Sequence, residues 1–206
     1  MRVVVNAAMS ADGKLSSRRR EQIAISGPED FERVDDVRAD SDAIMVGVGT
    51  VLADDPHLTV DGSSNPARVV ADSRARTPPD ARIVDDAAET YVLVTDAAPD
   101  DRIQALEDSG VVVLTAGTER VDVAAALDAL AVEGVETLMV EGGGELIFSL
   151  FEAGLVDELR VFVGPKIIGG REAPTLVDGD GFTEEFPQLS LESVDRMDDG
   201  VLLRWV

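Results

Sequence analysis

The chain contains no cysteine and a single histidine, His57, among its 206 residues. Without cysteine, the protein has no disulfides, no thiol nucleophile and no Cys/His zinc centre of the kind that nucleobase deaminases use. Carboxylates alone could hold magnesium, but acidic residues are so abundant here that their proximity would mean little, and we expect no metal. His57 falls in a turn-rich polar loop, where we expect it to face solvent.

Positive charge is also scarce, because 18 basic residues face 41 acidic ones and the formal net charge is −23. Only Lys14 and Lys166 are lysines. So large a negative charge disfavours nucleic acid and anionic membranes as partners. The acidic residues alternate with periodic apolar ones, which indicates a folded chain rather than a disordered one. We expect a halophilic protein whose self-repulsion is screened by salt.

Long apolar runs are missing as well. No run reaches the roughly 18 residues that would predict a membrane span. Met1 and Arg2 lead directly into a predicted strand rather than into a signal segment, so we expect a soluble, cytoplasmic protein. A length of 206 residues with 45% hydrophobic content favours one domain, residues 1–206, with an ample core.

The most informative stretch lies at residues 137–148. An apolar run ends at Glu141, is followed by Gly142, Gly143 and Gly144, and resumes with apolar residues at helical spacing. This pattern predicts a strand, a glycine turn and a helix. Such a turn lets backbone approach a ligand and points the first N–H groups of the helix at a phosphate or pyrophosphate. It differs from the G-x-G-x-x-G fingerprint, and a packing role alone is the alternative.

Strands and helices are predicted to alternate along the chain up to residue 153. The expected strands cover residues 3–8, 43–46, 68–74, 91–95, 111–114 and 137–141, and helices are expected at 28–40, 99–109 and 121–133. This order predicts a mostly parallel sheet with right-handed crossovers. Residues 156–163, 189–195 and 201–206 then read as strands, the last two joined by a hairpin at 197–200. The fold class is therefore α/β with an antiparallel C-terminal edge.

The first predicted helix has a clear start signal. Ser26 stands at the expected N-cap and Pro28 in the first turn. Arg38 falls near the end of the helix, where it could be a surface residue that stabilises the terminus. One face of the helix would carry Phe31, Val34 and Val37.

Polar or glycine residues follow four of the predicted strands at their carboxyl ends. They are Asn6, residues 47–50, residues 72–74 and residues 141–144. Because ligands bind at the carboxyl ends of parallel strands, we expect these features to converge on one cleft. Asn6 alone could equally be a hydrogen-bonded core amide.

Together the motifs resemble the riboflavin-pathway reductases, in particular their stand-alone archaeal members, which have a dihydrofolate reductase-like fold. The resemblance spans nearly the whole chain and is carried by residues 6–10, 12–14, 38–39, 45–47, 49–52, 54–56, 58–59, 72–74, 141–144, 154–158 and 165–170. It implies that NADPH reduces the ribosylamino group of a phosphorylated ribosylaminopyrimidine to ribitylamino. The related enzymes are dimers, and the apolar C-terminal strands agree with a homodimer.

The resemblance also implies the site residues. Arg38 would grip the 5′-phosphate of the substrate and Glu141 its ribose or pyrimidine. Asn6 and Ser26 would complete the substrate site. The residues implied in cofactor binding are Thr50, Asp54, Asp72, Ser73, Arg74, Gly142, Gly143, Gly144 and Glu145, with Ser73 and Arg74 near the adenosine ribose phosphate. No general acid is evident, although Asp54 could deliver a proton through water.

One departure concerns the phosphate. Bacterial fused relatives commonly carry an arginine where this chain has Val60 and Asp61, and Arg18, Arg19 and Arg20 are candidates to replace it. Two other functions stay open from the sequence: a pterin reductase of the same fold, and a non-catalytic nucleotide-binding module.

Overall fold

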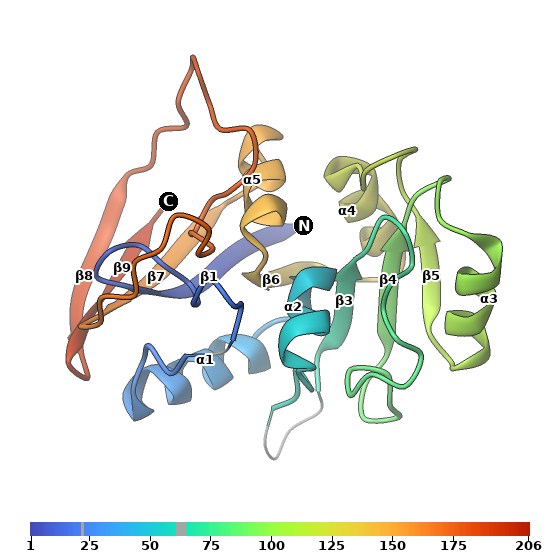
Figure 1. The fold of residues 1–206 in the computed structure, drawn as a ribbon, viewed down its shortest axis with the longest axis horizontal. Coiled ribbons are helices and arrows are strands. Elements are labelled where there is room, and N and C mark those ends of the chain that lie inside the picture. The colour runs from blue at the N-terminus through green and yellow to red at the C-terminus, as the bar shows by residue number, and fades with distance from the viewer. Residues whose placement is uncertain (22, 61–64) are drawn as a thin grey trace.

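The computed structural model of the chain describes residues 1–21, 23–60 and 65–206. Within these residues one nine-stranded sheet runs through the molecule in the order β5-β4-β3-β2-β6-β1-β7-β9-β8 (Figure 1). The strands are β1 (Arg2–Ser10), β2 (Ala43–Gly47), β3 (Ala67–Ala71), β4 (Thr90–Val94), β5 (Val112–Thr115), β6 (Thr137–Gly142), β7 (Glu158–Gly164), β8 (Leu191–Met197) and β9 (Gly200–Trp205).

The sheet confirms the predicted fold class. Strands β1 to β7 pair in parallel, whereas β9 runs antiparallel to β7 and β8 antiparallel to β9. Parallel neighbours need a crossover, and helices supply it at most of the connections, whereas β3 and β4 are joined by the turns at residues 72–89. The last two strands need only the turn at residues 197–200, where Met197 pairs with Gly200. The hairpin is therefore as predicted.

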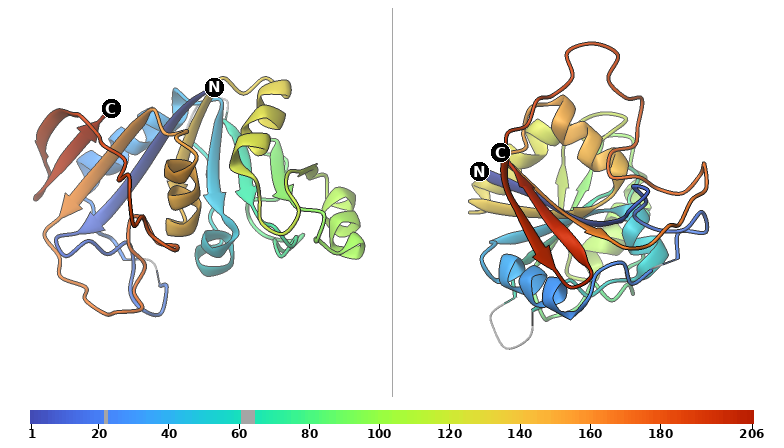
Figure 2. Two further views of the ribbon diagram at one scale, coloured as in Figure 1. Left: turned by 90° about the horizontal axis from the view of Figure 1, so that it is seen from above. Right: turned by 90° about the vertical axis from the view of Figure 1, so that its left-hand side faces the viewer.

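Helices cover both faces of the sheet. They are α1 (Pro28–Ala39), α2 (Val48–Asp54), α3 (Asp100–Asp108), α4 (Val123–Val132) and α5 (Gly144–Glu152). Helices α4 and α5 share one buried apolar cluster with the sheet, and α2 and α3 share another. Figure 2 shows α5 and α1 on opposite sides of the sheet. No helix in the described part of the chain has the length and apolar content needed to cross a bilayer.

Helix α2 occupies a segment for which the sequence predicted no helix and indicated only glycine and polar residues after a strand. Its Val48 and Val51 are buried in the cluster that α2 shares with α3. Glycine lowers helix propensity by about 1 kcal/mol relative to alanine, and this burial outweighs the cost of Gly49. The helix therefore starts directly at the carboxyl end of β2.

Helix α1 begins differently from the prediction. Its N-cap is Gly27, not Ser26, and Gly27 offers no side chain to cap it. The Asp198 carboxylate, from the β8–β9 turn, instead accepts the N–H groups of Glu29 and Asp30 at 3.2 and 3.1 Å, and the Glu29 carboxylate accepts the Asp198 N–H. Asp198, which is 169 positions from Glu29 in the sequence, thus caps the N-terminus of α1. The predicted apolar face is also only partly buried, since Phe31 is 53% exposed.

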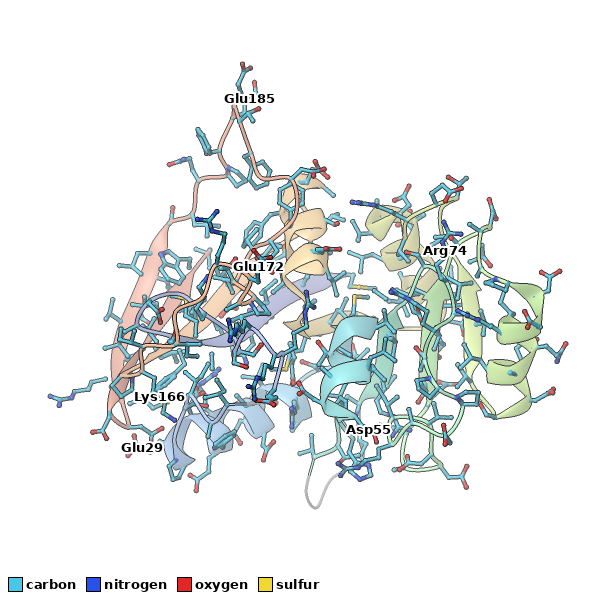
Figure 3. All side chains as sticks on the ribbon, viewed as in Figure 1. Glu29, Asp55, Arg74, Lys166, Glu172 and Glu185 are labelled. Carbon is cyan, nitrogen blue, oxygen red and sulfur yellow. The ribbon has the colours of Figure 1, made fainter. Side chains whose placement is uncertain are left out.

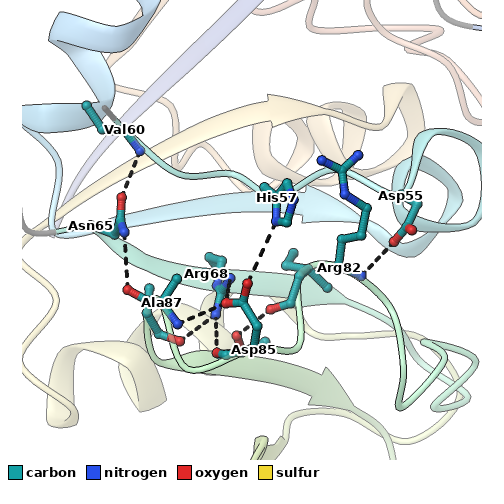
Figure 4. Close-up of polar contacts among 11 residues, drawn as sticks. Asp55, His57, Val60, Asn65, Arg68, Arg82, Asp85 and Ala87 are labelled. Atoms are coloured by element: carbon teal, nitrogen blue, oxygen red, sulfur yellow. Dashed lines mark hydrogen bonds and ion pairs between the residues drawn. The ribbon is translucent and has the colours of Figure 1, made fainter. Parts of the chain in front are cut away.

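His57 is exposed, as predicted, and lies beside a structural arginine (Figure 4). Its Nδ1 is 3.8 Å from the Asp85 carboxylate. Arg68, which is fully buried in β3, donates to that carboxylate at 2.7 Å and to the backbone oxygens of Asp85 and Ala88. These bonds lower the pKa of Asp85 and fasten the loop before β4 to the sheet.

Glu158 is the most heavily paired carboxylate near the antiparallel edge. It is 2% exposed and accepts hydrogen bonds from Arg2 of β1, Arg160 of β7 and Arg204 of β9. Burial by itself would raise the pKa of Glu158, but the bonds from Arg160 and Arg204 outweigh it and lower the pKa to about 2. The ionised carboxylate therefore joins three adjacent strands.

We expect Glu158→Gln to lower the free energy of unfolding at neutral pH by about 1.5–3 kcal/mol, the usual size of a hydrogen bond to a charged group. The pKa in the folded state lies below its ordinary value of 4.5, so this stability is present above that pH and disappears as the pH falls towards 2. Denaturant titrations across this pH range should show the free energies of unfolding of wild type and variant converging as the pH falls.

The matched control is Glu192→Gln. Glu192 pairs with the same Arg204 at 3.0 Å but is largely exposed, so its loss should cost less than about 1 kcal/mol. A gap between wild type and Glu158→Gln that stayed constant down to pH 2 would contradict the assignment.

Candidate active site

The carboxyl ends of β2 and β6 meet at two glycines. A Cβ added to Gly143 would lie 3.4 Å from the backbone nitrogen of Gly47 and 3.5 Å from its Cα. Gly143 has φ +98°, a conformation that side chains disfavour. The predicted strand, glycine turn and helix are confirmed here, because Gly143 ends the turn between β6 and α5.

Thr50, in the first turns of α2, faces this glycine turn. A Cβ on Gly142 would stand 3.4 Å from the Thr50 hydroxyl oxygen. Two segments that are 90 residues apart in the chain, each named in the predicted cofactor site, therefore lie side by side. The missing side chains allow the two segments to pack against each other, which is the packing role that the sequence left open. The role of these residues in binding nucleotide phosphates stays a prediction.

Asp178 lies beside the glycine turn, although no sequence motif assigned it a role. Its N–H donates to the Gly144 carbonyl at 3.1 Å, and a Cβ on Gly144 would come within 2.5 Å of its carboxylate. A negative group thus already stands beside the N-terminus of α5, where a negative charge is favourable. Glu145, in the same first turn of α5, is exposed.

Asn6 and Glu141 occupy neighbouring strands near the middle of the sheet. The pairing of Val5 with Val140 places Asn6 and Glu141 at the same level. Asn6 is only 5% exposed, and its side-chain oxygen has no hydrogen-bond partner among the described residues. An unsatisfied buried oxygen costs about 1–3 kcal/mol, so a donor from a ligand or a water would stabilise it. Asn6 is therefore not hydrogen-bonded through this oxygen to a described residue, and its role in binding substrate stays a prediction.

Arg38 and Glu141, predicted separately as substrate residues, are paired with each other. The Arg38 Nε and Nη2 donate to the two Glu141 carboxylate oxygens at 2.5 and 2.7 Å, and Nη1 reaches Asp35 at 3.3 Å. Burial would lower the pKa of Arg38, but the bond to Glu141 outweighs it and keeps the guanidinium charged. One cation therefore faces two carboxylates, and the planar fork is already used.

Residues 72–74 lie beyond β3, and their side chains have different partners. Asp72 is fully buried and accepts from Thr77 N and Oγ1 at 2.7 and 2.9 Å and from Arg76 Nε at 3.2 Å. Its carboxylate thus holds the loop at residues 72–77 in shape, and its predicted cofactor contact stays a prediction. The Ser73 hydroxyl accepts the Val121 N–H at 3.2 Å.

Arg74 is the accessible member of this group and is labelled in Figure 3. About half of its side chain is exposed, and it donates to the Ala97 carbonyl at 3.0 Å and to Glu119 at 2.5 Å. These partners follow β4 and β5, so Arg74 stands at the carboxyl edge of the parallel strands. The guanidinium is placed where a phosphate could exchange with Glu119.

Asp54 ends α2, and Ser26 lies just before the N-cap of α1. Asp54 is the last residue of α2, and although it is exposed by surface area, desolvation by the surrounding chain raises its pKa. A raised pKa keeps a carboxylic proton available at higher pH. Ser26 is half-buried and follows Ile25, which packs against Gly164 at the end of β7. Asp61 lies outside the described residues.

The chain belongs to the family described as "RibD C-terminal domain", whose model matches residues 1–203. Among solved structures, a deaminase/reductase from Thermotoga maritima superposes with a TM-score of 0.80 at 22% identity, covering 99% of this chain and 56% of that one. A dihydrofolate reductase from Enterococcus faecalis gives a TM-score of 0.53 at 13% identity, covering 99% and 95%. The fold is therefore dihydrofolate reductase-like, as expected from the motifs.

Closer relatives define the subgroup. The 2,5-diamino-6-ribosylamino-4(3H)-pyrimidinone 5′-phosphate reductase of Archaeoglobus fulgidus is 47% identical over 210 residues, which cover 96% of this chain and 94% of that protein. The protein of the same name from Methanothermobacter thermautotrophicus is 48% identical and covers 92% and 89%. The expected family resemblance is confirmed.

Proposed function

We propose that this protein reduces the ribosylamino group of 2,5-diamino-6-(ribosylamino)-4(3H)-pyrimidinone 5′-phosphate to a ribitylamino group in riboflavin biosynthesis. The observation that carries the proposal is near-full-length identity of 47–48% to two archaeal reductases of that name. The placement of Glu141 directly before Gly142, and level with Asn6 on the neighbouring strand, supports the proposal, because the Asn6 oxygen is buried without a partner among the described residues.

A bound nicotinamide cofactor would supply the hydride that forms the new C–H bond at the first carbon of the opened sugar. The chain itself would position the two ligands and manage one proton. Gly142, Gly143 and Thr50 fit the cofactor phosphates, and Asn6 would accept a hydrogen bond from the substrate. The reduced nitrogen gains a proton, and Asp54, with its raised pKa, is the candidate to deliver it through water.

The test follows NADPH consumption by absorbance in multimolar KCl, a condition chosen because a net charge of −23 favours screening. We expect oxidation with the ribosylaminopyrimidine phosphate and none with dihydrofolate. Turnover of dihydrofolate instead would favour the pterin reductase. Binding of NADPH without turnover of either compound would favour the nucleotide-binding module.

We infer a preference for NADPH over NADH from Arg74, whose exposed guanidinium could contact the additional phosphate. Arg74→Ala should lower the ratio of kcat/KM with NADPH to kcat/KM with NADH by about tenfold. The main cause should be a lower kcat/KM with NADPH. Arg102→Ala removes a neighbouring arginine that donates only to the Arg74 backbone, and serves as the control. An unchanged ratio in Arg74→Ala would exclude Arg74 from the cofactor site.

We further propose a homodimer formed through the edge strand β8. Leu191 and Val194 on this strand are each 57% exposed, which leaves apolar surface beside an unpaired strand edge. Light scattering in multimolar KCl should give twice the chain mass, and Val194→Asp should give a monomer. Val132→Asp, at an exposed valine on α4, is the control. A monomeric wild type would contradict the dimer.

A further inference from the structure

Gly144, the third glycine of the turn after β6, is in close contact with the connection between β7 and β8. A Cβ added to Gly144 would lie 2.5 Å from Asp178 Oδ2 and 2.8 Å from the Thr175 carbonyl oxygen. Gly144 is the first residue of α5, and a helical backbone is one that any residue adopts. The close approach of Thr175 and Asp178, and not backbone strain, is therefore what requires glycine here.

Asp178 fastens this connection to α5. Its backbone N–H donates to the Gly144 carbonyl at 3.1 Å. Its carboxylate accepts the Thr175 hydroxyl at 2.6 Å and the Thr175 N–H at 3.2 Å. The backbone of Asp178 thus holds α5, while its side chain closes a short turn that keeps the carboxylate against the first turn of the helix.

Two further residues extend the contact along α5. A Cβ added to Gly179 would lie 2.8 Å from the ring of Phe148, in the second turn of the helix. The Phe182 ring packs on the same Phe148, with 5.0 Å between the ring centroids and 45° between the planes. In Figure 3 the chain passes α5 between the labelled Glu172 and Glu185. We call residues 171–182 the strap, because they lie across the start of α5.

The first part of the strap is also bonded to the loop that follows β1. The Leu15 N–H donates to the Pro174 carbonyl at 2.9 Å, and Lys14 Nζ donates to the Ala173 carbonyl at 3.2 Å. Lys14 and Thr175 form an isolated antiparallel bridge. The strap therefore joins two segments that follow neighbouring parallel strands, the loop after β1 and the turn after β6. A movement of the strap would change the support of both.

Glycines with positive φ stand at both ends of the bonded part of the strap. Gly169 and Gly170 precede it with φ +67° and +92°, and Gly179 and Gly181 follow with φ +94° and +74°. Residues 171–178 between them contain neither helix nor strand. Hinges are short segments whose residues absorb large backbone changes, and glycine does so at the lowest steric cost. The strap is therefore held on α5 by few contacts, between residues suited to hinges.

The Asp178 carboxylate stands at the helix end that an anionic ligand would approach. Negative charge is favourable at a helix N-terminus, and in this structure the group in that place belongs to the strap. A carboxylate and a phosphate within a few ångströms repel each other. Glu145, exposed in the same turn, adds a second negative charge. A phosphate bound at the start of α5 would therefore be opposed by the closed strap.

We propose that the strap is a gate for a diphosphate ligand at the start of α5. Asp178 holds the gate closed, and the ligand opens it by displacing the Asp178 carboxylate. Opening also frees the loop after β1, through the contacts of Lys14 and Leu15 with the strap. In taking a nicotinamide dinucleotide as the diphosphate ligand, the inference rests on the proposed function.

The first arm measures the Kd of NADPH by calorimetry without substrate. It uses the lowest KCl concentration at which the wild type stays folded, because salt screens the repulsion. Asp178→Asn keeps an oxygen for Thr175 but removes the charge, so the Kd should fall about two- to fivefold. Asp180→Asn removes the same charge from an exposed position two residues further along the strap, and should leave the Kd unchanged.

The second arm follows amide hydrogen exchange in the strap by mass spectrometry. Saturating NADPH should make the peptide that covers residues 171–182 of the wild type exchange faster. Gly144→Ala should show fast exchange in this peptide without any ligand, because its methyl group would collide with the closed strap. Gly49→Ala is the matched control, since its Cβ in helix α2 would meet no atom closer than 3.8 Å. This control should exchange in the strap as the wild type does.

The gate and the proposed reaction fail in different ways. Unchanged or slower exchange of the strap with NADPH, or an unchanged Kd in Asp178→Asn, would overturn the gate even if substrate is reduced. Faster exchange with NADPH but no reduction of substrate would refute the reaction and leave the gate standing. Sodium pyrophosphate is the probe if NADPH does not bind, and strap exchange that is unaffected by pyrophosphate would then overturn the gate.

Discussion

The close approach of two backbones, at Gly47 and Gly143, is the constraint around which the site is built. Strands β2 and β6 are neighbours, and the chain leaves each of them for a helix at this level. A side chain at Gly143 would meet the Gly47 backbone at 3.4 Å, and its φ of +98° would be strained besides. The glycines therefore allow α2 and α5 to begin side by side.

Arg38 and Glu141 were each predicted to contact substrate, but in the fold they form an ion pair with each other. Each residue alone is a plausible ligand for substrate, and in the fold each is the other's main partner. A half-buried carboxylate would be costly without its cation, and the bidentate bond fixes its orientation. Glu141 is consequently presented in one direction beside Asn6, whose oxygen is the unsatisfied group.

Carboxylates from distant parts of the chain also stabilise helix ends and a loop. Asp198 in the last hairpin caps α1, Asp12 holds the loop after β7, and Asp178 stands at the start of α5. Each carboxylate is satisfied by backbone N–H groups rather than by a cation. An acidic chain with few lysines therefore uses some of its negative charge for internal structure. For Asp12, the hydrogen bonds also lower the pKa to about 2.

The sequence by itself determined the order of strands and helices apart from α2, the mostly parallel sheet, the antiparallel edge and the glycine turn at residues 142–144, because periodicity and turn chemistry act over a few residues. The motifs, taken in their order along the chain, also identified the family. Only the tertiary structure decided that Ser26 does not cap α1, that α2 is a helix, that Asp72 turns inward and that Arg38 binds Glu141. These outcomes depend on partners that lie up to 169 positions apart, such as Asp198 and Glu29, and local pattern carries no information about which distant groups will meet.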